Sequence, residues 1–319
     1  MKRITLSDIA KACGVSVNTV SHALHDKPDI SEQTKELIRR TAKELGYIQN
    51  ASASFLRSGV SKNIAVIVGD ISNPHFSILI KEVEQTAGKQ GYTSFIFNTD
   101  ENEKLEREAI ITSISKNVDG IIICPVQKSD ENLLFLKESG VPFTLIGRRS
   151  SIETNYVVCD DQNSGYLAAK YILEGKNKKT AILNGSLYIS SARERLEGIR
   201  NCYRDHGLEI GPKDIYELPV SGWQNGAKMK KILEKDYDSA ICFSDLIALE
   251  LLSCQEECGK KLTIVSFDNI QSRFHIPFRF PSITSSKAKM GHKAVEVLIS
   301  AIEGNTQPMQ IVLPTGLHS

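Results

Sequence analysis

The stretch "GVSVNTVSHAL", residues Gly14 to Leu24, decides how the start of the chain folds. Gly14 readily adopts a left-handed turn, because it has no side chain to clash with the backbone. Ser16 is a favourable N-cap for the helix that follows, and the helical period puts Val20 and Leu24 on its inward face. The stretch therefore predicts a tight turn and then a short helix.

The residues before this turn predict a first helix. "LSDIAKAC" offers Ser7 as N-cap and places Ile9 and Ala10 inward. Ala10, Gly14 and Val20 then have the spacing of a helix-turn-helix. The small Ala10 lets the two helices cross closely, Gly14 makes the turn, and Val20 packs the second helix on the first.

A third helix is predicted from Ser31 to about Leu45, closed by Gly46. Its expected inward residues are Leu37, Ile38, Ala42 and Leu45. The chain therefore begins with an all-α head. A small helical bundle without a role on DNA is the alternative interpretation of this pattern.

The outward face of the second helix favours DNA binding. Its N-terminal half carries side chains where a recognition helix contacts bases in the major groove: Val17, Asn18, Ser21 and His22. Asn18 can pair with adenine, Val17 can meet a thymine methyl, and His22 can contact guanine. Hydroxyls for phosphate contacts are offered by Thr5, Ser16 and Ser31. A solvated helix surface is the alternative for each of these residues.

The segment "TLSDIAKACGVSVNTVSHALHDKPDISEQTKELIRRTAKELGYIQNASASFLRSG", which starts at Thr5, joins three motifs in a fixed order. These are the helix-turn-helix, an "LGY" helix end and an "N-x-x-A-x-x-L" hinge. The segment resembles the DNA-binding head and hinge of the LacI/GalR repressors, and the resemblance continues through nearly the whole chain. His22 stands where the family usually has Arg, which implies an altered operator half-site.

The resemblance gives the hinge, "NASASFLRS", a role on DNA. The segment is too short and too polar to hold a stable helix alone. In the family it becomes ordered on DNA in the dimer and pushes a pair of leucines into the minor groove, where an apolar wedge bends the duplex. The matching residues are Asn50, Ala53, Leu56 and Arg57. A flexible linker is the alternative, but adjacent Phe55 and Leu56 count against it.

From Lys62 onward, apolar β-rich runs alternate with amphipathic helices, as in proteins with parallel sheets. Buried strands are predicted in a first set, "IAVIVG", "SFIFN", "GIIICP" and "FTLIG", and in a second set, "YVVCD", "KTAILNG", "DIYELP", "SAICFS" and "LTIVSFD". A final crossover helix at about Met290 to Glu303 and a last strand at "MQIVLP" follow. The pattern predicts an α/β body of two Rossmann-like lobes, similar to periplasmic sugar-binding proteins.

The expected domains are therefore a helix-turn-helix head at residues 1–48, a hinge at 49–60 and an effector-binding and dimerisation body at 61–319. Charge agrees with this division, since residues 1–60 carry nine Lys and Arg against six Asp and Glu, and the rest carry 30 against 32. A basic head is compatible with nucleic acid as a partner.

The sequence predicts a cytoplasmic protein. No run of eighteen apolar residues exists, and Ser7 and Asp8 stand where a secretory signal needs an apolar core. We expect no membrane contact. The seven cysteines lie in apolar segments and are expected to be reduced, buried thiols.

Motifs for enzymatic chemistry are missing from the sequence. "GDISNPHF" stands where a dinucleotide-binding glycine motif would follow the first strand, and there is no P-loop lysine, nucleophile elbow or "HExxH". Cys254 and Cys258 lack a nearby histidine or second cysteine pair that would complete a zinc site. We therefore predict no enzymatic activity, no cofactor and no metal.

Polar and aromatic side chains follow the predicted strands at their carboxyl ends, where α/β proteins bind ligands. The candidate effector residues are Asp70, Asn73, Phe76, Arg148, Ser191, Arg195, Trp223, Ser244 and Asp268. Phe76 and Trp223 can cover the apolar face of a sugar ring, and arginine and aspartate can bond its hydroxyls. The resemblance makes Arg195 and Asp268 the most typical of the set. Arg148 with Arg149 would admit a phosphate, so a sugar phosphate is the alternative ligand.

The expected function is a sequence-specific transcriptional regulator, a repressor, of a carbohydrate-utilisation operon. A homodimer would bind an inverted-repeat operator, and an effector between the lobes would rotate them and change the hinge spacing. The end, "LPTGLHS", has no heptad segment, which favours a dimer over a tetramer. The alternatives are a regulator that responds to a partner protein or to a non-sugar metabolite, and a sugar sensor without a DNA role.

Overall fold

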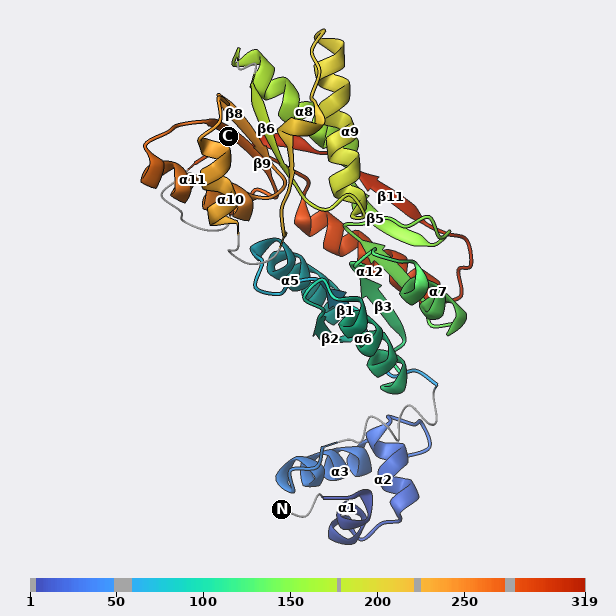
Figure 1. Cartoon of the computed structure of the whole chain (residues 1–319). Helices are drawn as coiled ribbons and strands as arrows, with labels where there is room; N and C mark the ends of the chain where they lie inside the picture. The colour runs from blue at the N-terminus through green and yellow to red at the C-terminus, as the bar shows by residue number, and fades with distance from the viewer. Residues whose placement is uncertain (1–3, 49–58, 177–178, 221–224, 273–278, 319) are drawn as a thin grey trace. The chain divides into compact units, whose positions relative to one another are not determined.

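The computed structural model describes residues 4–48, 59–176, 179–220, 225–272 and 279–318 (Figure 1). By its internal contacts the chain divides into a unit of Met1–Ser61 and a unit of Lys62–Ser319. The first unit is helical, and the second combines helices with two sheets. No helix in the described ranges is long and apolar enough to cross a membrane.

In the described part of the first unit, which we call the head, the helices are α1 (Leu6–Cys13), α2 (Val17–Leu24) and α3 (Glu32–Glu44). They enclose a small core of Ile9, Ala10, Val20, Ala23, Ile38 and Ala42. Gly14 ends α1 with a φ of 67° and donates its N–H to the carbonyl of Ala10. The predicted turn between α1 and α2 is therefore confirmed, as is the N-cap role of Ser16.

The predicted N-cap of the first helix is wrong. Helix α1 begins after Thr5, and Ser7 lies inside its first turn. Thr5 Oγ1 accepts a hydrogen bond from the N–H of Asp8 at 3.4 Å, and the Asp8 carboxylate accepts one from the N–H of Thr5 at 2.9 Å. This reciprocal capping box satisfies donors at both positions, whereas Ser7 has no acidic partner three residues later.

Two leucines of α3 are also misplaced by the prediction. Leu37 is 38% exposed and Leu45 is 39% exposed, while Lys35, Ile38 and Ala42 form the buried stripe. Leu37 precedes Ile38 by one residue and so lies about 100° away around the helix. Leu45 is the C-cap, where the helix has already ended.

Among its described residues, the second unit forms two six-stranded sheets, one in each lobe. The first has the order β11-β5-β4-β3-β1-β2 and comprises β1 (Asn63–Val68), β2 (Thr93–Asn98), β3 (Gly120–Ile123), β4 (Phe143–Ile146), β5 (Asn155–Cys159) and β11 (Gln310–Leu313). The second has the order β12-β10-β9-β8-β6-β7 and comprises β6 (Thr180–Asn184), β7 (Ile215–Glu217), β8 (Ser239–Cys242), β9 (Thr263–Phe267), β10 (Ser282–Thr284) and β12 (Gly316–His318). Neighbouring strands are parallel except β10 and β12.

Helices cover both faces of each sheet, as Figure 1 shows. In the first lobe, α5 (Pro74–Lys89) and α12 (Lys287–Ile302) cover one face, and α6 (Glu103–Ser115) and α7 (Glu131–Glu138) cover the other. In the second lobe, α8 (Asp161–Glu174) and α9 (Ser190–Asp205) lie opposite α10 (Gly226–Leu233) and α11 (Asp245–Cys258). Because both faces are buried, the central strands are mostly apolar, which is why sequence patterns identify them.

The chain exchanges segments between the lobes in a way that the strand pattern does not predict. "YVVCD", expected in the second set, is β5 and pairs with β4 and β11 in the first sheet. Helix α12 likewise packs in the core of the first lobe. Strands β10 and β12, of three residues each, were not predicted.

Strand β2 differs from the prediction of a buried strand. It is an edge strand of the first sheet, and Phe95 and Ile96 are 39% and 48% exposed. An edge strand has a neighbour on one side only, so its side chains are covered less completely. Two adjacent apolar side chains therefore face solvent in the described structure.

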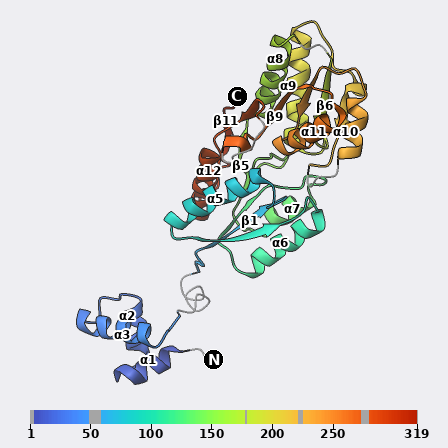
Figure 2. The same cartoon turned by 90° about the vertical axis from the view of Figure 1, so that its left-hand side faces the viewer.

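Helices α8 and α9 lie side by side (Figure 2), and their backbones approach closely at two glycines. A Cβ on Gly165 would lie 1.9 Å from the carbonyl oxygen of Arg195, and a Cβ on Gly198 would lie 1.8 Å from that of Gln162. Only glycine fits at these two positions. The contact also places α9, which carries Arg195, directly on the first turns of α8.

Asp245 is a fully buried carboxyl at the start of α11. Its Oδ1 accepts hydrogen bonds from the hydroxyls of Ser266 and Ser282, and its Oδ2 accepts one from the N–H of Ile270 at 2.7 Å. Burial, reinforced by the charge of Asp268, raises the pKa of Asp245 to about 6. The carboxyl ties α11 to β9, β10 and the 3-10 turn Ile270–Ser272.

This raised pKa predicts a pH-dependent stability. The folded chain holds the proton more tightly than the unfolded chain, whose carboxyl has a pKa near 3.8. The contribution of Asp245 is therefore complete below about pH 4 and is lost as the pH rises through about 6. We expect the free energy of unfolding of the wild type, measured against Asp245→Asn by urea denaturation, to fall by at most about 3 kcal/mol between these pH values. Glu131→Gln, on the surface of α7, should show no such slope; a flat difference for Asp245→Asn would contradict the assignment.

Candidate functional site

The N-terminal half of α2 has an accessible face in the described structure. Val17 is 47% exposed, Asn18 is exposed, and Ser21 and His22 are half-buried. The buried residues of α2 lie on its opposite side. The structure therefore brings the four predicted base-contacting residues together on one surface of the head.

His22 is engaged by an acidic neighbour. Its Nδ1 lies 2.6 Å from Oδ2 of Asp29, and this hydrogen bond holds the pKa of Asp29 below its usual range. With the Nδ1 proton directed at Asp29, Nε2 is the ring nitrogen left for a base. A neutral ring then presents an acceptor, which matches the amino group of adenine or cytosine, and only the protonated ring donates to guanine.

The three predicted phosphate-contacting hydroxyls are all N-caps. Thr5 caps α1, Ser16 caps α2 and Ser31 caps α3, each through a bond from a backbone N–H to the side-chain oxygen. Helix N-termini carry partial positive charge and suit phosphate groups. The predicted hinge residues Asn50, Ala53, Leu56 and Arg57 lie outside the described residues.

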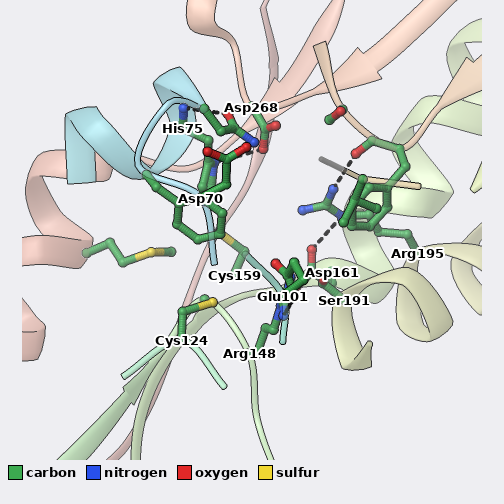
Figure 3. A pocket seen from close by; sticks show the side chains of 17 residues that line it. Asp70, His75, Glu101, Cys124, Arg148, Cys159, Asp161, Ser191, Arg195 and Asp268 are labelled. Atoms are coloured by element: carbon green, nitrogen blue, oxygen red, sulfur yellow. Dashed lines mark hydrogen bonds and ion pairs between the residues drawn. The ribbon is translucent and has the colours of Figure 1, made fainter. Parts of the chain in front are cut away.

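A cavity between the two lobes of the second unit gathers most of the predicted effector residues (Figure 3). Those that line it are Asp70, Asn73, Phe76, Arg148, Ser191, Arg195, Ser244 and Asp268. They come from the carboxyl ends of strands and the first turns of helices in both lobes. Trp223 lies outside the described residues, so the second aromatic wall stays a prediction.

The cavity also contains residues that the sequence analysis missed: His75, Glu101, Cys124, Gly147, Cys159, Asp161, Val220, Phe243 and Met290. Glu101 and Asp161 could have been found, because they follow β2 and β5 at the same strand ends used for the other predictions. Burial raises the pKa of Cys124 and of Cys159 to about 12. Both therefore remain neutral thiols and are not activated nucleophiles.

Arg195 is held rigidly at the cavity wall. Its Nε donates to Oδ1 of Asp161 at 2.7 Å, and its Nη1 donates to the carbonyl oxygen of Phe243 at 2.8 Å. The guanidinium carbon lies 4.9 Å from the ring centre of Phe243 and 4.3 Å from that of Phe267. Nη2 has no partner among the described residues and is the group that can donate to a ligand. Burial raises the pKa of Asp161, although Arg195 opposes that shift.

Asp268 directly follows β9 and has an unusual backbone conformation. Its φ is 101° and that of Asn269 is 50°, values that L-residues other than glycine rarely adopt. Lys287 and Thr284 both donate to its carbonyl oxygen. Strained residues held by their surroundings are frequent at ligand sites.

The side chain of Asp268 is an ionised acceptor. Its Oδ1 lies 2.9 Å from Nδ1 of His75. Burial opposes its charge, but His75, Lys287 and Arg195 outweigh burial and hold the pKa of Asp268 well below its usual range. Its carboxylate can therefore accept hydrogen bonds from a ligand at neutral pH.

Arg148 is present in the cavity but is already neutralised. Its Nη1 and Nη2 donate to the two carboxylate oxygens of Glu101 at 2.8 and 2.7 Å, and Nη1 also donates to the carbonyl of Pro125 at 2.8 Å. The side chains of Arg148 and Glu101 are 7% and 10% exposed. This buried, two-pronged ion pair leaves Arg148 little capacity for a second anion.

Hydrogen bonds join the lobes beside the cavity. Gln127, which follows β3, accepts from the N–H of Ser190 at 2.9 Å and donates to the carbonyl of Arg149 at 2.7 Å. The N–H of Arg149 donates to Ser190 Oγ at 3.1 Å, and its guanidinium pairs with Glu194 at 2.6 Å. A ligand that alters this contact would change how the lobes are held.

The cavity thus offers hydrogen-bond donors and acceptors around an aromatic side chain. Phe76 lies at the start of α5 and packs edge-on against the ring of His75, with 5.1 Å between the ring centres. Among the described residues, no group of three or more His, Cys, Asp or Glu side chains could hold a metal ion. The arrangement can bind and orient a small polar molecule.

Comparison with known proteins identifies both units. Residues 5–50 match the family described as bacterial regulatory proteins of the lacI family, and residues 64–276 match the periplasmic binding protein domain. The HTH-type transcriptional repressor PurR of Pasteurella multocida (strain Pm70) is 29% identical over 320 residues, which cover 97% of this chain and 95% of that protein.

Solved structures show the same fold. The lac repressor dimer bound to operator and the anti-inducer ONPF has a TM-score of 0.87 at 21% identity, covering 100% of this chain and 98% of that one. The transcriptional regulator CelR in complex with cellobiose has a TM-score of 0.75 at 23% identity, covering 99% of each chain. These proteins are repressors and regulators, not enzymes. The chain belongs to the LacI family of DNA-binding transcriptional repressors, with a helix-turn-helix head followed by a periplasmic-binding-protein-like body.

Proposed function

We propose that this repressor controls a carbohydrate-utilisation operon, and that a sugar or sugar derivative bound between the lobes changes its affinity for the operator. The observation that carries the proposal is the cavity around Phe76, where Arg195 and the carboxylates of Asp70 and Asp268 meet. Charged donors and acceptors beside an aromatic ring are suited to hydroxyl groups on a ring with an apolar face. CelR, which shares the fold, was solved with cellobiose.

The ligand would act through the contacts that join the lobes. Arg195 and Ser191 lie in the first two turns of α9, which also carry Ser190 and Glu194, the partners of Gln127 and Arg149. A ligand that pulls on Arg195 therefore changes the geometry of the same helix turns that hold the first lobe. Operator and effector must then alter each other's affinity by the same factor.

We further propose that the repressor acts as a homodimer on an inverted repeat. The exposed edge strand β2, with Phe95 and Ile96, supports this proposal, because an uncovered apolar edge favours pairing with a second chain. Ile71, in the loop that follows β1, is also 48% exposed. A two-fold dimer would present two heads to two half-sites.

Selection from random DNA with the full-length chain tests the proposal. We expect an inverted repeat to be enriched, and at least one member of a panel of sugars to change the affinity for that repeat roughly tenfold or more in fluorescence anisotropy. Sedimentation should give a dimer in the absence of DNA. A sequence without two-fold symmetry, or silence across the sugar panel, would contradict the dimer or the sugar, respectively.

A substitution of Asn18 tests whether the exposed face of α2 contacts DNA bases. Asn18→Ala removes two hydrogen bonds to a base and should weaken binding to the selected repeat by about 1–3 kcal/mol without changing the free energy of unfolding. Gln33→Ala alters an exposed amide on α3 and should leave affinity unchanged. Equal affinities for the two variants would remove Asn18 from the base contacts.

A further inference from the structure

We propose that Glu101 is the specificity-determining residue that closes this cleft to anionic ligands. The inference rests on the proposed function, in that it assumes that the effector binds in the cavity between the lobes. It concerns the class of effector: neutral, polyhydroxylated molecules are admitted, whereas phosphorylated or carboxylated molecules are rejected. A pair of buried arginines would otherwise make such a cavity attractive to an anion.

Both arginines of the cavity are neutralised from within the protein. Arg148 gives both terminal nitrogens to Glu101, and Arg195 gives Nε to Asp161. All four of these side chains are at most 12% exposed, so solvent screens the charges weakly. Two further carboxylates, Asp70 and Asp268, line the same cavity. His75 and Lys287 lie beside Asp268 and balance its charge. An entering phosphate would therefore find both arginines already paired with carboxylates, and Glu101 is the carboxylate that occupies Arg148.

The loop after β2 places the Glu101 carboxylate beside Arg148. Asp100 and Glu101 have consecutive φ values of 49° and 54°, which non-glycine residues seldom adopt. The side-chain amide of Asn98 fixes the loop by donating to Asp100 at 2.6 Å. The strained backbone is held in place by these contacts, which indicates that the position of Glu101 matters.

Gly69 makes the space that Glu101 needs. A Cβ at this position would lie 2.2 Å from Oε1 of Glu101. Gly69 directly follows β1, and its lack of a side chain leaves room for the Glu101 carboxylate to reach Arg148. The ion pair thus depends on a left-handed loop, a glycine and a two-pronged arginine contact, which come from three separate parts of the chain.

The test uses inorganic phosphate as the probe and the full-length chain. In the wild type, we expect no saturable, phosphate-dependent rise in melting temperature relative to chloride at the same ionic strength. Glu101→Gln removes the neutralising charge and should create such a rise, with a phosphate affinity at least tenfold above that of the wild type. Glu101→Gln combined with Arg148→Gln should lose the gain, because the cation that binds phosphate has been removed.

Failure to gain phosphate binding in a folded Glu101→Gln chain would overturn the proposal. Saturable phosphate binding by the wild type that Arg148→Gln abolishes would do the same. If Glu101→Gln does not fold, Glu101→Ser, whose short side chain leaves a pocket for the anion, replaces it in the same assay.

Paired ligands separate this proposal from the sugar proposal. The wild type is compared by calorimetry with glucose and glucose 6-phosphate, and with ribose and ribose 5-phosphate. In each pair we expect the phosphorylated sugar to bind more weakly than its neutral partner. A phosphorylated sugar that binds equally well contradicts the role of Glu101 and leaves the sugar proposal standing. A gain of phosphate binding in Glu101→Gln, together with silence of every sugar, supports Glu101 and contradicts the sugar.

Discussion

Replacing Arg195 by methionine is expected to abolish effector binding in the cleft and to lower the free energy of unfolding by about 3–5 kcal/mol. The methionine keeps the aliphatic part of the side chain between Phe243 and Phe267 but removes the charge. Asp161, whose side chain is 3% exposed, would then be a buried carboxylate without its cation. Breaking one partner of a buried pair costs more than the pair contributes, since the remaining charge stays desolvated.

A second substitution separates the two expected effects. Adding Asp161→Asn to Arg195→Met removes the orphaned charge and should recover most of the lost stability, as measured by urea denaturation. It cannot restore the Arg195 Nη2 donor, so the sugar found in the anisotropy screen should still fail to change operator affinity. If the double variant responds to that sugar as the wild type does, Arg195 does not contact the effector.

The second large effect is expected from Gly198→Ala, which should lower the free energy of unfolding by about 3 kcal/mol. The added methyl would lie 1.8 Å from the carbonyl oxygen of Gln162, and the obstacle is helix backbone rather than a flexible side chain. Helices α8 and α9 must therefore move apart. Because α9 carries Arg195 and α8 carries Asp161, the separation should also weaken effector binding.

Gly88→Ala is the matched control for this prediction. Gly88 lies in α5, a methyl group added to it would meet no heavy atom within 4 Å, and its φ is not positive. The same substitution there should be neutral or stabilising by about 0.5–1 kcal/mol, because alanine loses less backbone entropy than glycine in a helix. Equal destabilisation by both variants would mean that the close α8 and α9 contact is not responsible.

The helices of the head and most strands of the body could be predicted because local signals are strong there. A helix-turn-helix needs a small residue, a turn glycine and an apolar contact at fixed spacing, and Ala10, Gly14 and Val20 supply them. Strands that are buried on both faces are continuous apolar runs. The N-cap at Thr5 was missed because both Thr5 and Ser7 are good capping residues, and only the reciprocal bond with Asp8 distinguishes them.

The rule that ligands bind at the carboxyl ends of parallel strands located the cavity residues. It placed Phe76, Arg195 and Asp268 correctly around one cavity, although they are far apart in the chain. It also applied to Glu101 and Asp161, which the sequence analysis overlooked. What it could not give is the pairing of charges, because hydrogen-bond partners such as Arg148 and Glu101 are 47 residues apart.

Local sequence patterns alone specify a helical DNA-reading head and a two-lobed α/β body, because both depend on the spacing of apolar, small and capping residues along the chain. Which strands share a sheet is decided in the folded protein, since β5 and β11 join the first lobe through contacts between distant segments. The fold also decides the state of each charge in the cleft. The sequence predicts Arg148 as a cation available to a ligand. In the folded protein it is paired with Glu101, because a left-handed loop and Gly69 allow that carboxylate to reach it.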